Sequence, residues 1–233
     1  MNMKVDLCGV TLNNPVMTAS GTFGSGAEYA EFVDLNKLGA VVTKGVANVP
    51  WPGNPTPRVA EVYGGMLNAV GLQNPGIDLF VERDIPFLKQ FDTKIMVNVC
   101  GHSTEEYIEV VERLRDQPVD LLEINISCPN VKEGGIAFGQ DPKAVEAITK
   151  EMKKHAAQPV IMKLSPNVTD ITEMARAAEA GGADGLSLIN TITGMKIDIN
   201  CQKFVLANKT GGMSGPAIHP VAVRMVYQTA QAV

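Results

Sequence analysis

Short apolar or β-branched runs alternate along the chain with stretches whose apolar residues recur every three or four positions. Such runs are typical of strands, and the recurrence between them is typical of amphipathic helices. The alternation therefore predicts successive strand–helix units around a parallel sheet. Its predicted strands are residues 16–19, 40–43, 95–99, 121–124, 160–162 and 185–189, and a small hairpin around residues 5–12 precedes them.

Capping residues predict where three helices begin. Ser103 starts a helix that is expected to run to about Gln117, Asp141 with Pro142 starts the next, and Asp170 starts a third. Side chains of this kind accept hydrogen bonds from the unpaired N–H groups of a first helical turn, and proline is tolerated there. These starts alternate with the predicted strands, as strand–helix units require.

A long segment rich in Gly and Pro, residues 48–75, interrupts this pattern after the second strand. It is too long for a plain strand-to-helix connection, so we expect a folded insertion with functional content. The 233 residues contain no low-complexity linker, and no internal repeat is stronger than the strand–helix alternation. We therefore expect a single domain, residues 1–233, with this insertion.

Nearly every predicted strand ends in a polar residue that packing alone does not require. Asn and Lys are also common where strands simply meet solvent, so each residue alone is weak evidence. Six in phase favour a (β/α)8 TIM barrel, in which the C-terminal strand ends and the loops after them build the active site. The six are Ser20, Lys44, Asn98, Asn125, Lys163 and Asn190.

Composition argues against several classes of function. The net charge is −5 and the basic residues are scattered, so nucleic acid is not an expected partner. Polar residues interrupt every apolar stretch before the ~20 residues of a membrane span, and residues 1–10 lack the core of a signal peptide, so we expect a cytoplasmic protein without a membrane segment. The 4 cysteines are widely spaced, so neither a metal site nor an iron-sulfur cluster is expected.

Cys128 carries the clearest candidate chemistry. It follows a predicted strand, is stiffened by Pro129, and precedes a loop with glycines at 134, 135 and 139. A thiol so placed can act as a base or a nucleophile under a mobile loop. The remaining cysteines are interpreted as packed thiols, the commonest state of an unpaired cysteine; they are Cys8, Cys100 and Cys201.

Ordered motifs along the whole chain resemble the dihydroorotate dehydrogenases. In chain order they are ASG at 19–21, TKG at 43–45, GNPTPR at 53–58, MLNAVGLQNPG at 66–76, NISCPN at 125–130, KLSPNVTD at 163–170, NT at 190–191 and GGMSG at 211–215. The resemblance implies an FMN flavoprotein that oxidises (S)-dihydroorotate to orotate in pyrimidine (UMP) biosynthesis.

The type within that family is implied by three features. A cysteine at position 128, where the membrane-associated type has serine, resembles the soluble types. Residues 130–139 and 163–170 resemble the NAD-linked, two-subunit type, in which a partner subunit carries FAD and an iron-sulfur cluster and passes electrons to NAD. The resemblance further implies a homodimer of catalytic subunits within a heterotetramer.

Site roles also follow from the resemblance. Cys128 would be the base that removes a proton from C5 of the substrate, and Lys163 would stabilise the negative charge of reduced flavin. The expected FMN contacts are Ser20, Lys44, Gly45, Asn98, Asn125, Lys163, Ile189 and Gly215. The expected substrate contacts are Lys44, Asn68, Ala69, Val70, Gly71, Leu72, Asn125, Asn190 and Thr191, and no metal is expected.

The chain departs from the family pattern at its end. Family members continue through two further strand–helix units, whose Gly-rich turns hold the FMN phosphate. We therefore expect a (β/α)8 barrel that lacks its last two units, from a partial sequence.

Two other functions stay open. A dihydropyrimidine dehydrogenase-type barrel shares an Asn-x-Ser-Cys-Pro loop and acts on uracil or thymine, but residues 130–135 (NVKEGG) resemble the dihydroorotate enzymes. The absent phosphate turns motivate an inactive barrel that serves as a structural or partner-binding subunit. Turnover of uracil but not dihydroorotate would favour the first, and a lack of flavin-dependent activity the second.

Overall fold

The computed structural model describes residues 2–126, 132–133 and 136–233. Five parallel strands form the central sheet, in the order β11-β10-β7-β6-β3. Their bounds are β3 Ala40–Val42, β6 Lys94–Val99, β7 Leu121–Asn125, β10 Val160–Lys163 and β11 Gly185–Ser187. Five of the predicted strands are therefore present, each within a few residues of the expected range.

The first predicted strand, residues 16–19, is reduced to a single parallel bridge between Met17 and Ala40. Its backbone runs beside β3, but the Thr18 hydroxyl replaces the backbone in the next step of the ladder. That hydroxyl accepts from the Val42 N–H at 2.8 Å and lies 3.2 Å from the Val42 carbonyl oxygen. The segment lies where a first barrel strand belongs, although its hydrogen bonding is not that of a regular strand.

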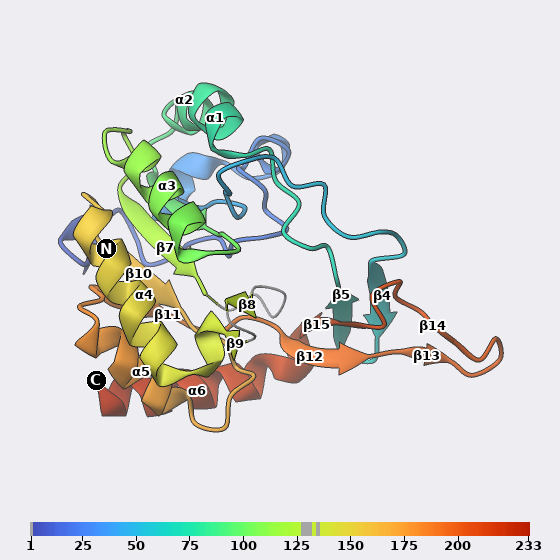
Figure 1. Ribbon diagram of the computed structural model, residues 1–233. Coiled ribbons are helices and arrows are strands. Elements are labelled where there is room, and N and C mark those ends of the chain that lie inside the picture. Colours follow the sequence, from blue (N-terminus) through green and yellow to red (C-terminus); the bar gives the residue numbers. More distant parts are fainter. Residues whose placement is uncertain (1, 127–131, 134–135) are drawn as a thin grey trace.

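Helices cover the outer face of the sheet (Figure 1). They are α3 Thr104–Leu114, α4 Pro142–His155, α5 Ile171–Ala180 and α6 His219–Ala232, and successive members pack together. The three predicted helix starts are confirmed, because the side chains of Ser103, Asp141 and Asp170 each accept a first-turn N–H. The first of these helices ends at Leu114, before the expected Gln117.

A shorter helical segment lies between β5 and β6 in the sequence. It comprises α1 Ile77–Leu79, a π-helical turn at Phe80–Asp84 and α2 Ile85–Leu88. Phe80 and Leu88 are fully buried in the main hydrophobic core together with the outward-facing residues of the parallel strands. The segment therefore covers the part of the sheet near β3 and β6.

The N-terminal hairpin closes one end of the sheet. Its strands, β1 Val5–Leu7 and β2 Val10–Leu12, pair antiparallel as predicted. Leu7 and Val10 pack on a separate apolar cluster formed by Val42, Met96, Leu121 and Ile161, one from each of four adjacent strands. This packing covers the inner face near the N-terminal strand ends, so a site is expected at the C-terminal ends.

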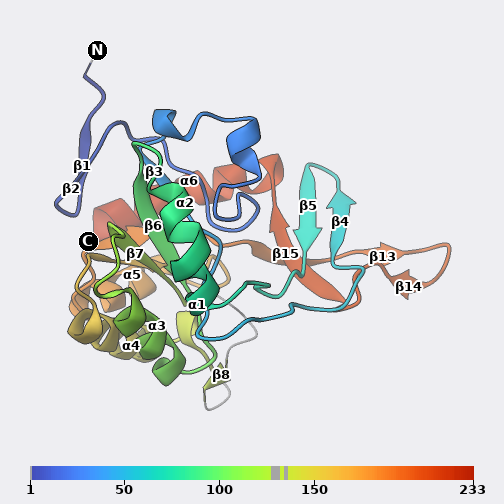
Figure 2. The same ribbon diagram turned by 90° about the horizontal axis from the view of Figure 1, so that it is seen from above.

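A second, antiparallel sheet lies to one side of the parallel sheet in both views (Figures 1 and 2). Its order is β12-β15-β5-β4. Strands β4 Val59–Val62 and β5 Gly65–Asn68 come from the segment 48–75, whereas β12 Ile192–Met195 and β15 Thr210–Ser214 come after β11. The sequence pattern predicted folded structure in residues 48–75, but it did not predict β12 and β15.

The remaining strands are short two-residue pairs. Strands β13 Ile197–Asp198 and β14 Lys203–Phe204 form a hairpin between β12 and β15. Strands β8 Lys132–Glu133 and β9 Ile136–Ala137 lie in the loop between β7 and α4. A curled parallel sheet with helices outside is the arrangement of part of a (β/α)8 barrel, which confirms the predicted fold class. The division into one domain stays a prediction.

Candidate active site

Strand alternation sorts the inner face of the sheet into two layers. Because side chains alternate between faces, Met96 and Asn98 share one face of β6, and Leu121, Glu123 and Asn125 share one face of β7. The residues nearer the N-terminal strand ends are apolar and pack on the hairpin. The residues nearer the C-terminal ends form what we call the polar layer: Lys44, Asn98, Glu123, Asn125, Lys163 and Ser187.

Lys163 is the best-defined cation of the polar layer. It ends β10, and its side chain is 12% exposed. Its Nζ donates to the Ser20 Oγ at 2.8 Å and lies 4.0 Å from Glu123 Oε2. A sparsely exposed ammonium with one hydroxyl and one carboxylate nearby keeps donor capacity for a bound anion or carbonyl oxygen.

The amides of two neighbouring strands join this group. Asn98 is 1% exposed and donates from Nδ2 to Glu123 Oε2 at 2.6 Å. The Asn125 Nδ2 donates to Asn98 Oδ1 at 3.4 Å, and the backbone carbonyl of Asn125 accepts from the Tyr107 hydroxyl at 2.7 Å. The structure thus brings the predicted residues Ser20, Asn98, Asn125 and Lys163 together around Glu123.

Lys44 and Gly45 enter the site from the end of β3. Burial lowers the pKa of the Lys44 ammonium; Cys100 opposes this shift, and the neighbouring charges of Arg58 and Lys163 add to it. A Cβ on Gly45 would lie 3.1 Å from Asn98 Oδ1 and 3.2 Å from Cys100 Sγ, so glycine allows β3 to approach β6 closely here. Cys100 is buried, as expected, and it lies beside the site. Cys201 is exposed, so the interpretation of that cysteine as a packed thiol was wrong.

A second group of predicted residues gathers where β15 passes the loop after β11. Asn68 on β5 donates from Nδ2 to the Gly212 carbonyl at 3.3 Å. A Cβ on Gly212 would lie 1.9 Å from Thr191 Oγ1, so the two residues are in direct contact. Asn190 Oδ1 accepts the Thr191 N–H at 2.7 Å. Asn68, Asn190 and Thr191 therefore form one cluster, which holds paired amide and hydroxyl groups.

The two groups are joined through the backbone next to Lys163. The Asn190 N–H donates to the Leu164 carbonyl at 3.2 Å, and the Leu164 N–H donates to the Ser187 carbonyl at 2.9 Å. Asn167 also fastens this loop, because its Nδ2 donates to the Thr191 carbonyl at 2.9 Å and its Oδ1 accepts the Thr193 N–H at 2.9 Å. The ammonium and the amide cluster are thus parts of one continuous site.

The loop that follows β5 contributes mainly backbone. Asn54 donates from its backbone N–H to the Val70 carbonyl at 3.0 Å and from Nδ2 to the Ala69 carbonyl at 3.0 Å. A Cβ on Gly71 would lie 2.7 Å from the Asn54 side chain, so a larger residue has no room. A methyl group of Leu72 lies 3.6 Å from the position that a Cβ on Gly45 would occupy. The loop therefore reaches the polar layer.

Three predicted residues have a less direct relation to the site. Gly215 is exposed and lies against the turn between β4 and β5, where its Cβ would be 2.6 Å from the Gly65 Cα. Ile189 packs partly buried against the main core. Cys128, with the rest of residues 127–131, lies outside the described residues.

Sequence reasoning gave no role to Glu123 or Ser187. The Ser187 Oγ donates to Glu123 Oε1 at 2.6 Å, so the carboxylate lies at the centre of the polar layer. Two-residue alternation back from Asn125 predicts that Glu123 shares its face. A carboxylate in the middle of a buried strand was therefore a signal that the sequence did contain.

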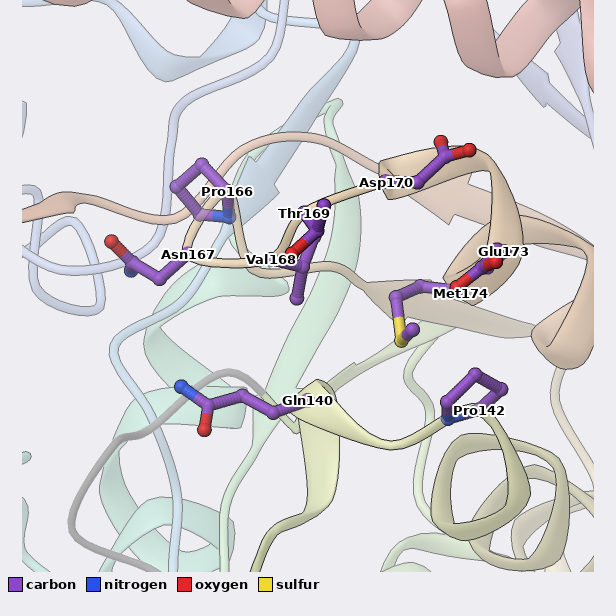
Figure 3. Close-up of a pocket in the computed structure, with 9 residues that line it drawn as sticks. All are labelled: Gln140, Pro142, Pro166, Asn167, Val168, Thr169, Asp170, Glu173 and Met174. Atoms are coloured by element: carbon purple, nitrogen blue, oxygen red, sulfur yellow. The ribbon is translucent and has the colours of Figure 1, made fainter.

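A hollow lies beside this site rather than in it (Figure 3). Its volume is about 490 Å³, and it lies between the start of α4 and the loop that joins β10 to α5. Among the described residues, its lining includes the carboxylates Asp170 and Glu173 but no basic side chain. An anionic ligand is therefore better matched to the polar layer, where Lys44 and Lys163 supply positive charge.

Comparison with known proteins identifies the family. The family model described as dihydroorotate dehydrogenase matches residues 2–233. The chain belongs to the dihydroorotate dehydrogenase family. Within the described part of the chain, no helix has the length and apolar character needed to cross a membrane.

Similar members of the family carry one printed name, dihydroorotate dehydrogenase B (NAD(+)), catalytic subunit. The protein of that name from Lachnoclostridium phytofermentans is 75% identical over 233 residues, which are 100% of this chain and 78% of that protein. The one from Alkaliphilus metalliredigens is 68% identical, over 100% of this chain and 77% of its own length. The one from Geobacter sulfurreducens is 57% identical, over 100% of this chain and 76% of its own length. These relatives are named as oxidoreductases, in agreement with the enzyme class that the motifs predicted.

Proposed function

We propose that this chain oxidises (S)-dihydroorotate to orotate, with FMN as cofactor, in pyrimidine biosynthesis. One observation carries the proposal: in a member of this family, the C-terminal strand ends bring two lysines and a cluster of amides into one site. Orotate combines a carboxylate with an imide edge, and ammonium and amide groups are the partners that such a ligand requires.

The residues present fit a flavin. Lys163 offers a sparsely exposed ammonium, and Ser20 and Asn98 offer neutral hydrogen-bonding groups within the same layer. A Cβ on Gly21, the residue after Ser20, would meet no atom within 4 Å, so the backbone next to Ser20 borders open space. When bound, FMN would take up the hydride that leaves C6 of dihydroorotate.

Each group of the chain then has a distinct task. Lys163 stabilises negative charge on the cofactor, and Lys44 binds both the cofactor and the substrate carboxylate. Asn125, Asn190 and Thr191 orient the substrate ring through its polar edge, and Asn68 does so from β5. Fixed neutral amides recognise that edge without burying a further charge. Ala69, Val70, Gly71 and Leu72 complete the substrate contacts through backbone and close packing.

Cys128 is the proposed base, which takes the proton from C5 of the substrate. This assignment rests on the NISCPN motif and on its place directly after β7. The polar layer contains two lysines, and positive charge near a thiol favours the thiolate form that a base must have. Gly45, Ile189 and Gly215 are proposed as further cofactor contacts on the resemblance alone.

The printed name of the relatives also suggests a partner. A catalytic subunit of an NAD(+)-linked enzyme implies a second polypeptide, and we infer that it carries FAD and an iron-sulfur cluster and passes electrons to NAD. The expected assembly is a homodimer of catalytic subunits within a heterotetramer, located in the cytoplasm. We also propose that residues 1–233 belong to one barrel domain, in which the segment 48–75 is an insertion.

Steady-state assays test this function. The purified chain, loaded with FMN, should form orotate from dihydroorotate with an artificial electron acceptor, and it should reduce NAD(+) only when the electron-transfer subunit is added. Uracil is the control substrate. Turnover of uracil in place of dihydroorotate, or no turnover of either by a flavin-loaded protein, would overturn the proposal.

A further inference from the structure

Glu123 is a buried carboxylate in the centre of the candidate site, and the proposed reaction assigns it no task. Glu123 is 4% exposed, and it lies on the inner face of β7 between Leu121 and Asn125. A carboxylate removed from water loses hydration, and this loss must be offset by hydrogen bonds and opposite charge. A hydrophobic residue would fill the same position without that cost.

Three other strands supply its partners. Asn98 on β6 and Ser187 on β11 each donate to one of its oxygens at 2.6 Å. Lys163 on β10 lies 4.0 Å from the oxygen that Asn98 also contacts. Of these partners, Lys163 and Asn98 are proposed cofactor contacts. The carboxylate therefore joins two groups of the flavin site that lie on different strands.

We propose that Glu123 is a positioning residue that holds Lys163 and Asn98 in place and sets, through its charge, how strongly the site stabilises an anionic reduced flavin. The proposal rests on the proposed function, since it needs a flavin beside Lys163. In a buried site a unit charge acts over several ångströms with little screening. The carboxylate offsets part of the Lys163 charge, so it keeps the reduced flavin from being held too firmly to pass its electrons on.

The direct test is the flavin midpoint potential of a Glu123→Gln variant, measured by equilibration with a reference dye. The amide keeps the size of the side chain and removes the charge. Its oxygen can still accept from Asn98, and the Ser187 hydroxyl can rotate to accept from its nitrogen. We expect the ratio of reduced to oxidised flavin to rise about tenfold at a fixed dye potential, a shift of about +30 mV for a two-electron couple. An unchanged potential would overturn the proposal.

Asp84→Asn is the matched control. Asp84 is also a buried carboxylate, with a serine donor at 2.9 Å and an arginine at 2.7 Å, but it lies in the helical segment between β5 and β6. The same chemical change there should leave the potential as in the wild type. An equal shift in both variants would mean that the effect is not specific to the polar layer.

Ser187→Ala separates a charge effect from a purely structural one. Removing the hydroxyl takes away a hydrogen bond that disperses the charge of Glu123, so the potential should fall, opposite to the Glu123→Gln shift. If the midpoint potentials of Glu123→Gln and Ser187→Ala shift in the same direction, the proposed role of the Glu123 charge is contradicted. If Glu123→Gln does not fold, Ser187→Ala alone decides, because an unchanged potential there also overturns the proposal. A wild-type protein that binds no flavin would instead refute the proposed function itself.

Discussion

Two lysines of the polar layer have different surroundings and therefore different tasks. Lys163 has the Ser20 hydroxyl and the Glu123 carboxylate as neighbours, so its charge is partly offset within the protein. Lys44 lies among groups of which two, Arg58 and Lys163, are also positive. An anionic ligand relieves that repulsion, which fits the proposed role of Lys44 as the group that binds the substrate carboxylate.

The lowered pKa of Lys44 predicts a pH dependence of stability. Since the folded-state pKa lies below the ordinary 10.5, the unfolded chain binds more protons between the two values, and this residue's contribution to stability rises as the pH increases through that window. Removing the charge in a Lys44→Met variant should flatten this part of the curve. Urea unfolding of both proteins across the window measures the difference, and parallel curves would contradict the shift.

A Cys128→Ala variant tests the proposed base. Without the thiol, proton removal from C5 should slow flavin reduction by dihydroorotate by about a hundredfold or more. Flavin content should stay as in the wild type, because the cofactor contacts lie on other residues. Stopped-flow absorbance under anaerobic conditions measures the rate. An alanine variant that reduces its flavin at the wild-type rate would refute the assignment, and Cys201→Ala, at an exposed position, serves as the control.

At the scale of the elements, the caps of the outer helices are individually weak but specific. The Asp141 side chain accepts the Ala144 N–H at 3.1 Å at the start of α4, directly after the loop that contains Cys128. Asp141→Ala should lower the free energy of unfolding by about 1 kcal/mol, whereas Asp141→Asn keeps an acceptor and should lose much less. Urea denaturation checks both values, and equal losses would show that the hydrogen bond is not responsible.

The contact between β15 and the loop after β11 predicts a selective effect on substrate binding. A methyl group in Gly212→Ala would overlap Thr191 Oγ1, so the threonine must move away from its place beside Asn190. We expect a raised KM for dihydroorotate with flavin content unchanged. In Gly194→Ala, on the paired strand, the added methyl meets a flexible Leu67 methyl at 3.1 Å and the Met213 Cβ at 4.0 Å, so KM should stay near the wild-type value. Equal KM values in the two variants would contradict the proposed role of Thr191.

The sequence could predict the parallel strands and helix starts because both have local causes. Strands buried on both faces read as continuous apolar runs, and capping side chains act within their own helix. Strand β15 was missed since Thr-Gly-Gly-Met-Ser has little strand character, and its glycines are required instead by the close approach of Thr191 and Asn68. Such contacts join distant segments, so no local pattern reports them.

At the scale of the whole molecule, the described elements surround the parallel sheet on different sides. The N-terminal hairpin covers the inner face at one end, the helices cover the outside, and the antiparallel sheet stands to one side near the other end (Figures 1 and 2). The strand-end residues could therefore be predicted as a group from strand phase alone. Glu123 and Ser187 could not be assigned roles in that way, because their hydrogen bonds depend on the register between strands.

The central claim is that this chain transfers electrons from dihydroorotate to a bound flavin. Anaerobic titration of the FMN-loaded protein with dihydroorotate tests it most directly, with the flavin absorbance and the orotate formed measured in the same sample. The account predicts that the oxidised-flavin band bleaches as one orotate appears per flavin reduced. A flavin that stays oxidised in excess dihydroorotate would contradict it.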